Sequence, residues 1–304
     1  MKIALALLLI FCLAGSRPLS VAGQAKYSFG VRITGHGKPM ILIPGYKGSA
    51  DTYNDVVAHY KDHYKCYVIT LAGFAGQPPS GVHDHLLQKQ RDDIIAYIIN
   101  EHLKRPVIVG FSFGGVLATW AATTRPDLTG PLIDIDGTPF DISLQTNPFN
   151  KDSLINDHIV KYEKLVDKPT TYWKKRDSLY HTPASMKLGD PYVLKLVTDT
   201  NRLKEINIWD AASDFRSGAL MDLEADTVDM RLSVARLQLP VLVLGSWVSW
   251  DYRLKSDAEK DYADKWAKAK NVTIVFSDKG KHFLMYDDLS WMLAQMDGFL
   301  KNYN

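Results

Sequence analysis

A serine between glycines is the residue whose setting most clearly predicts chemistry. Ser112 lies in a Gly-x-Ser-x-Gly motif at residues 110–114, directly after the apolar run 107–109 and before small residues that tolerate a helix. A strand that turns sharply into a helix displays such a serine at the bend, and a β-carbon at Gly110 or Gly114 would collide with neighbouring backbone. The helix N-terminus favours negative charge nearby. The pattern predicts a nucleophilic serine; an ordinary strand–helix turn is the alternative.

A nucleophilic serine needs a base, and one histidine is placed to supply it. A serine hydroxyl is unreactive at neutral pH unless a neighbouring group takes its proton. Of the nine histidines, His282 lies in a loop directly beyond the apolar run 271–276, the last strand that the sequence predicts. The alternative is a hydrogen-bonded histidine without a chemical role.

Metal or cofactor chemistry has little support in the sequence. Two histidine pairs have the spacing of metal ligands, but no third ligand accompanies either pair in sequence. These pairs are His59 with His63 and His83 with His85. We therefore expect neither a metal ion nor an organic cofactor.

Apolar runs that alternate with helical patterns predict the elements that position these residues. The predicted strands are residues 27–34, 39–44, 66–70, 107–109, 131–135, 239–245 and 271–276. Helices are predicted after the serine and at residues 51–64, 84–103, 256–268 and 287–300. Strands that alternate with helices imply right-handed crossovers. The expected fold is α/β, with a mainly parallel twisted sheet covered by helices on both faces.

The alternation stops between residues 138 and 236. Amphipathic helical patterns replace it at residues 152–165, 190–204 and 208–222. An insertion at this point lies at the carboxyl edge of the strands, where sheets of this kind bind ligands. The sequence thus predicts a helical insertion above the site.

Three motifs occur in an order that resembles the α/β-hydrolase superfamily over nearly all of the chain. They are Pro44-Gly45-Tyr46-x-Gly48 after one strand, the motif around Ser112, and Gly280-Lys281-His282-Phe283 after the last strand. The resemblance implies a core made of residues 23–137 and 237–304, with residues 138–236 as a helical cap or lid. Relatives that are dehalogenases or epoxide hydrolases need a carboxylate at the position of Ser112, so the serine argues against both activities.

The carboxylate that orients the histidine has two candidates. Asp136 comes directly off the predicted strand 131–135, next to a glycine, in a place that some lipases of the superfamily use. A carboxylate at the end of a buried strand needs a partner to stay ionised, and His282 would supply one. Asp251 follows the strand 239–245, where the superfamily most often carries its acid, but the separation is longer than usual. We prefer Asp136 and keep Asp251 as the alternative.

Two backbone amides are expected to stabilise the oxyanion. One belongs to Phe113 and the other to Tyr46, whose loop has Pro44 where the superfamily commonly has histidine. Aromatic residues near the expected site suggest an apolar acyl or aryl pocket, although core packing explains them equally well. The candidate substrate-binding residues are Phe111, Phe140 and Trp247.

Composition and the N-terminal pattern indicate which binding partners and which cellular compartment to expect. The 304 residues carry a formal charge of +2, and no basic cluster indicates nucleic acid or an anionic membrane as a partner. Lys2, the apolar run 3–13 and small residues up to Ala22 resemble a secretory signal that is too short to anchor the chain stably in a membrane. We expect residues 1–22 to be a signal peptide, with cleavage near Ala22 to Ala25 and export to the periplasm or medium.

The cysteines agree with this interpretation. Cys12 lies in the expected signal, which leaves Cys66 without a partner for an internal disulfide. Cys66 sits in an apolar strand, so a buried structural thiol is expected.

The combined prediction is an exported serine hydrolase that cleaves a small carboxylic ester, thioester or lactone through an acyl-enzyme. A catalytically silent binding protein of the same fold and an acyltransferase with the same three residues are the alternatives. The substrate's identity and acyl length, and the oligomeric state, stay open.

Overall fold

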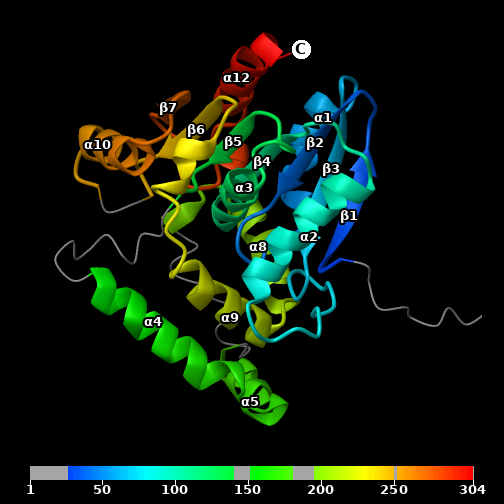
Figure 1. The fold of residues 1–304 in the computed structure, drawn as a ribbon, viewed down its shortest axis with the longest axis vertical. Coiled ribbons are helices and arrows are strands. Elements are labelled where there is room, and N and C mark those ends of the chain that lie inside the picture. Colours follow the sequence, from blue (N-terminus) through cyan, green and yellow to red (C-terminus); the bar gives the residue numbers. More distant parts are fainter. Residues whose placement is uncertain (1–26, 140–150, 181–194, 250–251, 304) are drawn as a thin grey trace, which may run out of the picture.

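Seven strands form one sheet in the computed structural model, which describes residues 27–139, 151–180, 195–249 and 252–303 (Figure 1). The strand order is β1 (Phe29–Thr34), β3 (Tyr64–Leu71), β2 (Lys38–Ile43), β4 (Val107–Phe111), β5 (Leu132–Ile135), β6 (Val241–Ser246) and β7 (Val272–Ser277). β1 pairs with β3 in the antiparallel sense, and the other neighbours are parallel. The predicted, mainly parallel sheet is confirmed.

Helices cover both faces of this sheet, and strand β2 shows why. Its side chains alternate: Ile41 and Ile43 belong to one buried cluster, and Met40 and Leu42 to the other. A strand buried on both faces reads as a continuous apolar run. The first face is covered by α2 (Leu86–Asn100), α3 (Phe113–Thr124) and α10 (Lys255–Trp266), and the second by α1 (Asn54–Tyr60) and α12 (Leu289–Leu300).

Short helical turns lie between these elements or follow the last of them. They are η1 (Ala50–Tyr53), η3 (Ser233–Arg236), α11 (Leu284–Asp287) and η4 (Lys301–Tyr303). The helix predicted over residues 51–64 is shorter in the structure, because the chain turns after Tyr60 and Tyr64 already begins β3. The amide of His63 closes that turn by donating to the carbonyl of Tyr60 at 3.0 Å.

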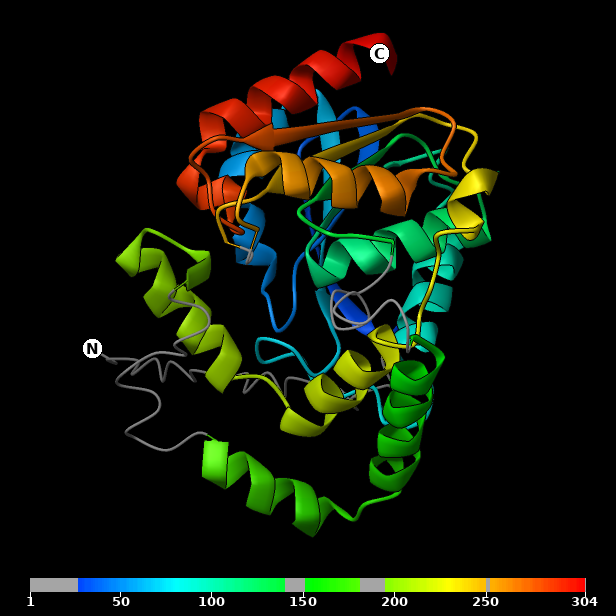
Figure 2. The ribbon, with the colours of Figure 1, turned by 90° about the vertical axis from the view of Figure 1, so that its left-hand side faces the viewer.

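Within the described residues, the segment between β5 and β6 contains α4 (Lys151–Val166), α5 (Thr170–Tyr180), α8 (Thr200–Ala211) and α9 (Phe215–Ala225). They gather at the end of the molecule opposite the C-terminus (Figures 1 and 2). The continuous helix predicted over residues 208–222 is wrong. Asp214 breaks it and caps α9 by accepting the amide of Ser217 at 2.8 Å, while its own amide donates to the carbonyl of Gly73 at 2.6 Å.

The helix predicted over residues 190–204 also differs from the structure. Residues 190–194 lie outside the described residues, and residues 197–199 are not helical. Asp199 caps the start of α8 by accepting the amide of Asn201 at 2.8 Å. Side-chain caps of this kind compete with helix continuation, and a hydrophobic pattern alone does not register them.

Cys66 is fully buried in β3. Burial raises the pKa of its thiol to about 11, which disfavours the reactive thiolate. The prediction of a buried structural thiol is confirmed.

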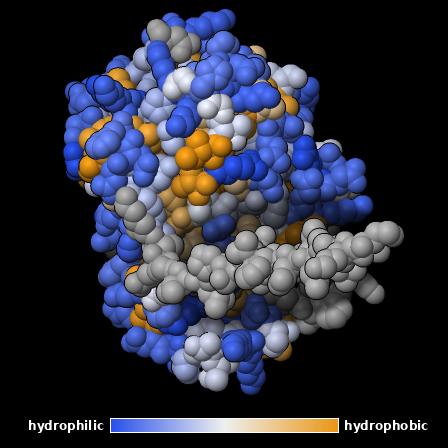
Figure 3. Space-filling view, turned by 90° about the vertical axis from the view of Figure 1, so that its right-hand side faces the viewer, coloured by the Kyte–Doolittle hydropathy of each residue, from blue (hydrophilic) through white to orange (hydrophobic). Residues whose placement is uncertain are grey.

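On the face at the β1 edge, the described residues that are in view are mostly hydrophilic. Hydrophobic residues form several patches among them, the largest near the middle of the face (Figure 3). Within the described ranges, every helix is too short or too polar to cross a bilayer.

Gly110→Ala tests the backbone packing beneath the serine. An added β-carbon would lie 2.3 Å from the carbonyl oxygen of Gly114, and only backbone movement relieves that contact. We expect the free energy of unfolding to fall by about 2 kcal/mol or more, measured by urea denaturation. Gly298→Ala in α12 is the control: its β-carbon meets nothing within 4 Å, and a gain of about 0.5–1 kcal/mol is expected. Equal midpoints for Gly110→Ala and the wild type would contradict the close packing.

Candidate active site

Ser112 lies at the bend between β4 and α3, in a strained backbone conformation. Its φ of 53° and ψ of −121° place a non-glycine residue at positive φ. Its amide donates to the carbonyl of Ile135 at 2.8 Å, which fixes the bend against β5. A β-carbon at Gly114 would lie 2.2 Å from the carbonyl oxygen of Ile43, so the expected need for glycine is confirmed.

His282 follows β7 and turns its ring toward the bend. Its amide donates to Oγ of Ser249 at 2.7 Å, which fixes the loop. The imidazole packs on the ring of Phe111, with ring centroids 4.8 Å apart, and the residue is only 5% exposed. Nε2 lies 2.8 Å from Oγ of Ser112, although 170 residues separate the two in sequence.

Asp136 completes the arrangement on the other side of the imidazole. Its Oδ2 lies 2.5 Å from Nδ1 of His282. An ionised carboxylate only accepts hydrogen bonds, so Nδ1 carries the proton of the neutral ring and Nε2 is left to accept from Oγ of Ser112. The structure thus brings Ser112, His282 and Asp136 into one hydrogen-bonded chain. Asp251, the alternative acid, lies outside the described residues.

Asp134 is a second carboxyl group that sequence reasoning missed. It lies in β5, two residues before Asp136, is fully buried, and accepts the amide of Gly137 at 2.9 Å through Oδ1. Its Oδ2 has no hydrogen-bond partner in the described part of the chain. Burial raises the pKa of Asp134 to about 8, with a further contribution from the charge of Asp136, so this carboxyl is mostly neutral at pH 7. Its place in an otherwise apolar strand, Leu-Ile-Asp-Ile, was the sequence signal for its burial.

The loop after β2 brings a second set of amides against the serine. A β-carbon at Gly45 would lie 3.4 Å from Cβ of Ser112, so the loop passes next to the hydroxyl. The amide of Gly48 donates to the carbonyl of Gly45 at 2.9 Å and closes the turn. The amides of Tyr46 and Phe113 donate to no acceptor among the described residues, which leaves both available to an oxyanion.

The aromatic residues predicted to bind substrate have different surroundings. Phe111 is 2% exposed and lies against the imidazole of His282, as part of a core cluster. Trp247 is half-buried at the end of β6, and its indole N–H is buried without a partner in the described ranges. Phe140 lies outside the described residues.

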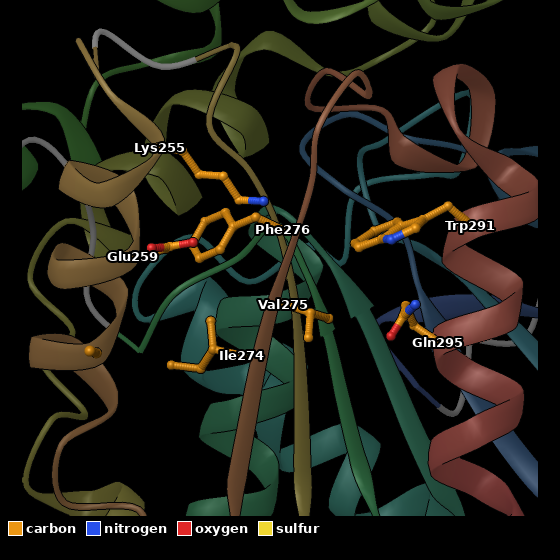
Figure 4. Close-up of a pocket in the computed structure, with 8 residues that line it drawn as sticks. Lys255, Glu259, Ile274, Val275, Phe276, Trp291 and Gln295 are labelled. Atoms are coloured by element: carbon orange, nitrogen blue, oxygen red, sulfur yellow. The ribbon is translucent and has the colours of Figure 1, made fainter.

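A cavity of about 540 Å³ lies along the outer edge of β7, between α10 and α12. Figure 4 shows Lys255 and Glu259 of α10 on one side of it and Trp291 and Gln295 of α12 on the other. Ser112, Asp136 and His282 do not line it. The chemistry described above therefore does not use this cavity.

Among the residues that the structure describes, no three acidic, histidine or cysteine side chains are grouped to hold a metal ion.

Sequence comparison covers most of the chain. Residues 40–293, most of the chain, match the sequence profile of the alpha/beta hydrolase family. The chain belongs to the alpha/beta hydrolase family. It is 26% identical over 105 residues to a pimeloyl-[acyl-carrier protein] methyl ester esterase of Aliivibrio salmonicida, which covers 34% of this chain and 38% of the relative. It is 27% identical over 128 residues to an alpha/beta hydrolase superfamily protein of Bacillus subtilis, covering 42% and 44%. The chain thus spans about two fifths of the length of these curated relatives.

Solved structures support the fold over a longer stretch. The enol-lactonase from Burkholderia xenovorans is similar with a TM-score of 0.66 at 13% identity, over 90% of this chain and 96% of that protein. A deformylase from Pseudomonas putida is similar with a TM-score of 0.59 at 17% identity, over 88% and 95%. At these identities the likeness concerns the fold alone.

Asp134→Asn tests the neutral carboxyl. The pKa of Asp134 is raised to about 8 in the folded protein, against about 3.9 in an unfolded chain. The folded protein therefore keeps a proton that the unfolded chain releases, so the contribution of Asp134 to stability is present below pH ~4 and lost as the pH rises to about 8. Asparagine keeps an acceptor for Gly137 and does not titrate. We expect the stability of the variant relative to wild type to rise by about 1 kcal/mol per pH unit between pH 5 and 8.

Urea unfolding at several pH values within this range measures the difference. Asp264→Asn on the exposed side of α10 is the matched control and should show a constant offset from wild type. A constant offset for Asp134→Asn as well would mean that Asp134 is already ionised in the folded protein.

Proposed function

We propose that the protein is a serine hydrolase that cleaves a small carboxylic ester, thioester or lactone, with Ser112, His282 and Asp136 as its catalytic residues. One observation carries the proposal: the continuous hydrogen-bonded chain from Oγ of Ser112 through the imidazole of His282 to Oδ2 of Asp136, at 2.8 Å and 2.5 Å. This is the arrangement in which a histidine activates a serine and a carboxylate fixes the histidine tautomer.

The steps follow from the positions of these atoms. Nε2 of His282 takes the proton of Ser112 as Oγ attacks the carbonyl carbon, and the new oxyanion is held by the amides of Tyr46 and Phe113. His282 then gives its proton to the leaving oxygen or sulfur, which leaves an acyl-serine. A water molecule, deprotonated by the same nitrogen, releases the acid and restores the serine. Asp136 stabilises the imidazolium that forms in both halves.

The substrate class rests on similarity and on the surroundings of the serine. Two proteins that this chain resembles are named for a methyl ester esterase and an enol-lactonase, and both reactions attack a carbonyl next to oxygen. Residues 138–236 are proposed to act as a cap over this substrate. In support, Nζ of Lys47, beside Tyr46, forms an ion pair of 2.6 Å with Asp210 of α8.

Covalent labelling tests the proposed nucleophile and base. A fluorophosphonate probe is expected to label the wild type at Ser112, to leave Ser112→Ala unlabelled, and to label His282→Ala far more slowly. Hydrolysis of short-chain p-nitrophenyl esters should fall by about 10³-fold or more in both variants. Absence of labelling in folded wild-type protein would favour a binding protein, and labelling without ester turnover would favour an acyltransferase.

Two asparagine variants test the proposed acid with the same assays. Asp136→Asn is expected to lower kcat by about 10³–10⁴-fold because the imidazole loses its orienting partner, whereas Asp251→Asn should stay close to wild type. The reverse result would assign the acid to Asp251.

Export is proposed from the N-terminal pattern. Removal of residues 1–22 takes away Lys2 and Arg17 and no acidic residue, so the formal charge would change from +2 to 0. In a secretion-competent host, N-terminal sequencing of the exported protein is expected to begin at Gly23 or Lys26. Leu8→Arg, which interrupts the apolar run, should keep the full-length chain inside the cell. An unprocessed wild-type chain confined to the cytosol would overturn the proposal.

A further inference from the structure

We propose that Ser246 and Tyr262 are positioning residues, whose hydrogen bonds select Asp136 as the charged aspartate of the site and hold it against His282. This inference rests on the proposed function for its kinetic consequence. The charge state that it describes can be measured without any substrate.

Every contact in question is buried. The amide of Ser246 donates to Oδ1 of Asp136 at 2.6 Å, and its hydroxyl donates to Oδ2 at 2.9 Å. The phenol of Tyr262 lies 3.2 Å from Oδ1. Ser246, Tyr262 and Asp136 are 0%, 1% and 3% exposed. With Nδ1 of His282 on Oδ2, each carboxylate oxygen therefore has at least two hydrogen-bond donors among the described residues, in a place that water scarcely reaches.

The two donors come from different elements, and each is fixed by packing. Ser246 ends β6, the strand next to β5, and the amide of Asp136 donates to the carbonyl of Leu244 in that strand at 2.7 Å. Tyr262 projects from α10, and its ring packs on Phe276 of β7 with centroids 5.1 Å apart. Burial and the charge of Asp136 raise the pKa of Tyr262 well above its usual value, so the phenol keeps its proton and donates.

Asp134 shows what happens to a carboxyl without this support. It lies two residues earlier in the chain, but a single amide donates to it and its Oδ2 has no partner among the described residues. Its raised pKa means that it stays neutral at pH 7. Neighbouring carboxyls whose surroundings separate their charge states take different roles in a site. Here the donors at Asp136 decide which of the two carries the charge.

Loss of a donor is expected to act on the protonation of the Asp136–His282 pair. The titratable groups that face Asp136 in the described residues are His282, Asp134, Tyr252 and Tyr262. When a neutral donor is removed, the ionised carboxylate loses stabilisation and the pair holds its proton to a higher pH. The base form of His282 then appears at higher pH.

The experiment compares Ser246→Ala and Tyr262→Phe with Tyr252→Phe. The control removes a phenol that hydrogen bonds to Asp261 instead of Asp136. For hydrolysis of p-nitrophenyl acetate, we expect the acid limb of the pH profile of kcat/KM to shift to higher pH by about one unit in Ser246→Ala and Tyr262→Phe. The expected fall in kcat is about tenfold with KM within about twofold, and Tyr252→Phe should match wild type. A merely structural role would lower activity without moving the limb.

A second measurement decides the inference without turnover. In protein labelled with ¹⁵N-histidine, the ring nitrogens of His282 report its titration by NMR, and His282→Gln identifies its signals. We expect the titration midpoint to rise by about one unit in Ser246→Ala and Tyr262→Phe. Unchanged midpoints in both variants overturn the inference. If the wild type neither hydrolyses esters nor reacts with a fluorophosphonate, the proposed function fails, and the NMR result still stands for or against the roles of Ser246 and Tyr262.

Discussion

The site depends on keeping one carboxylate ionised where almost no water reaches it. Asp136 and His282 are 3% and 5% exposed, so hydration contributes little to their charge. An uncompensated charge at such a place would cost several kcal/mol and would be neutralised by a proton instead. The hydrogen bonds from Ser246, Tyr262 and His282 replace the missing water. These donors replace water only if the fold itself holds them against Asp136. The order of the strands in the sheet does this.

The strand order places the chemical groups side by side. β4, β5, β6 and β7 are consecutive neighbours in the sheet, and all are parallel. Their carboxyl ends deliver, in the same order, Ser112, Asp136, Ser246 and the loop with His282. Residues that are up to 170 positions apart in sequence thus meet because one edge of a rigid sheet collects them. This also accounts for an acid at the end of β5: the neighbouring strand ends carry Ser112 on one side and Ser246, which donates to Asp136, on the other.

Local sequence was sufficient to predict those parts of the fold and of the site that depend on residues within one element. The glycines around Ser112, the apolar strands and the loop position of His282 each follow from residues within one element. Ser246 and Tyr262 could not be found in this way, because their contacts with Asp136 span 110 and 126 residues and depend on how α10 packs on the sheet. Asp134 looked like an ordinary strand residue until its burial showed that it is mostly neutral at pH 7. The breaks before α8 and α9 were missed because the side chains of Asp199 and Asp214 cap helices where the hydrophobic pattern alone continues.

Helix α8 is attached to the core in a different way from the groups that are proposed to be catalytic. α8 is joined to it by ion pairs of Asp210 with Lys47, at 2.6 Å, and of Arg202 with Asp55, at 2.8 Å. All but Lys47 are more than a quarter exposed, and exposed pairs of this kind contribute about 0–1 kcal/mol each. The groups at the four strand ends are instead held by buried hydrogen bonds and close backbone packing. Under the proposed function, sequence change in α8 would alter what reaches Ser112 at little cost to the hydrogen-bonded groups at the strand ends, which would separate the choice of substrate from the chemistry.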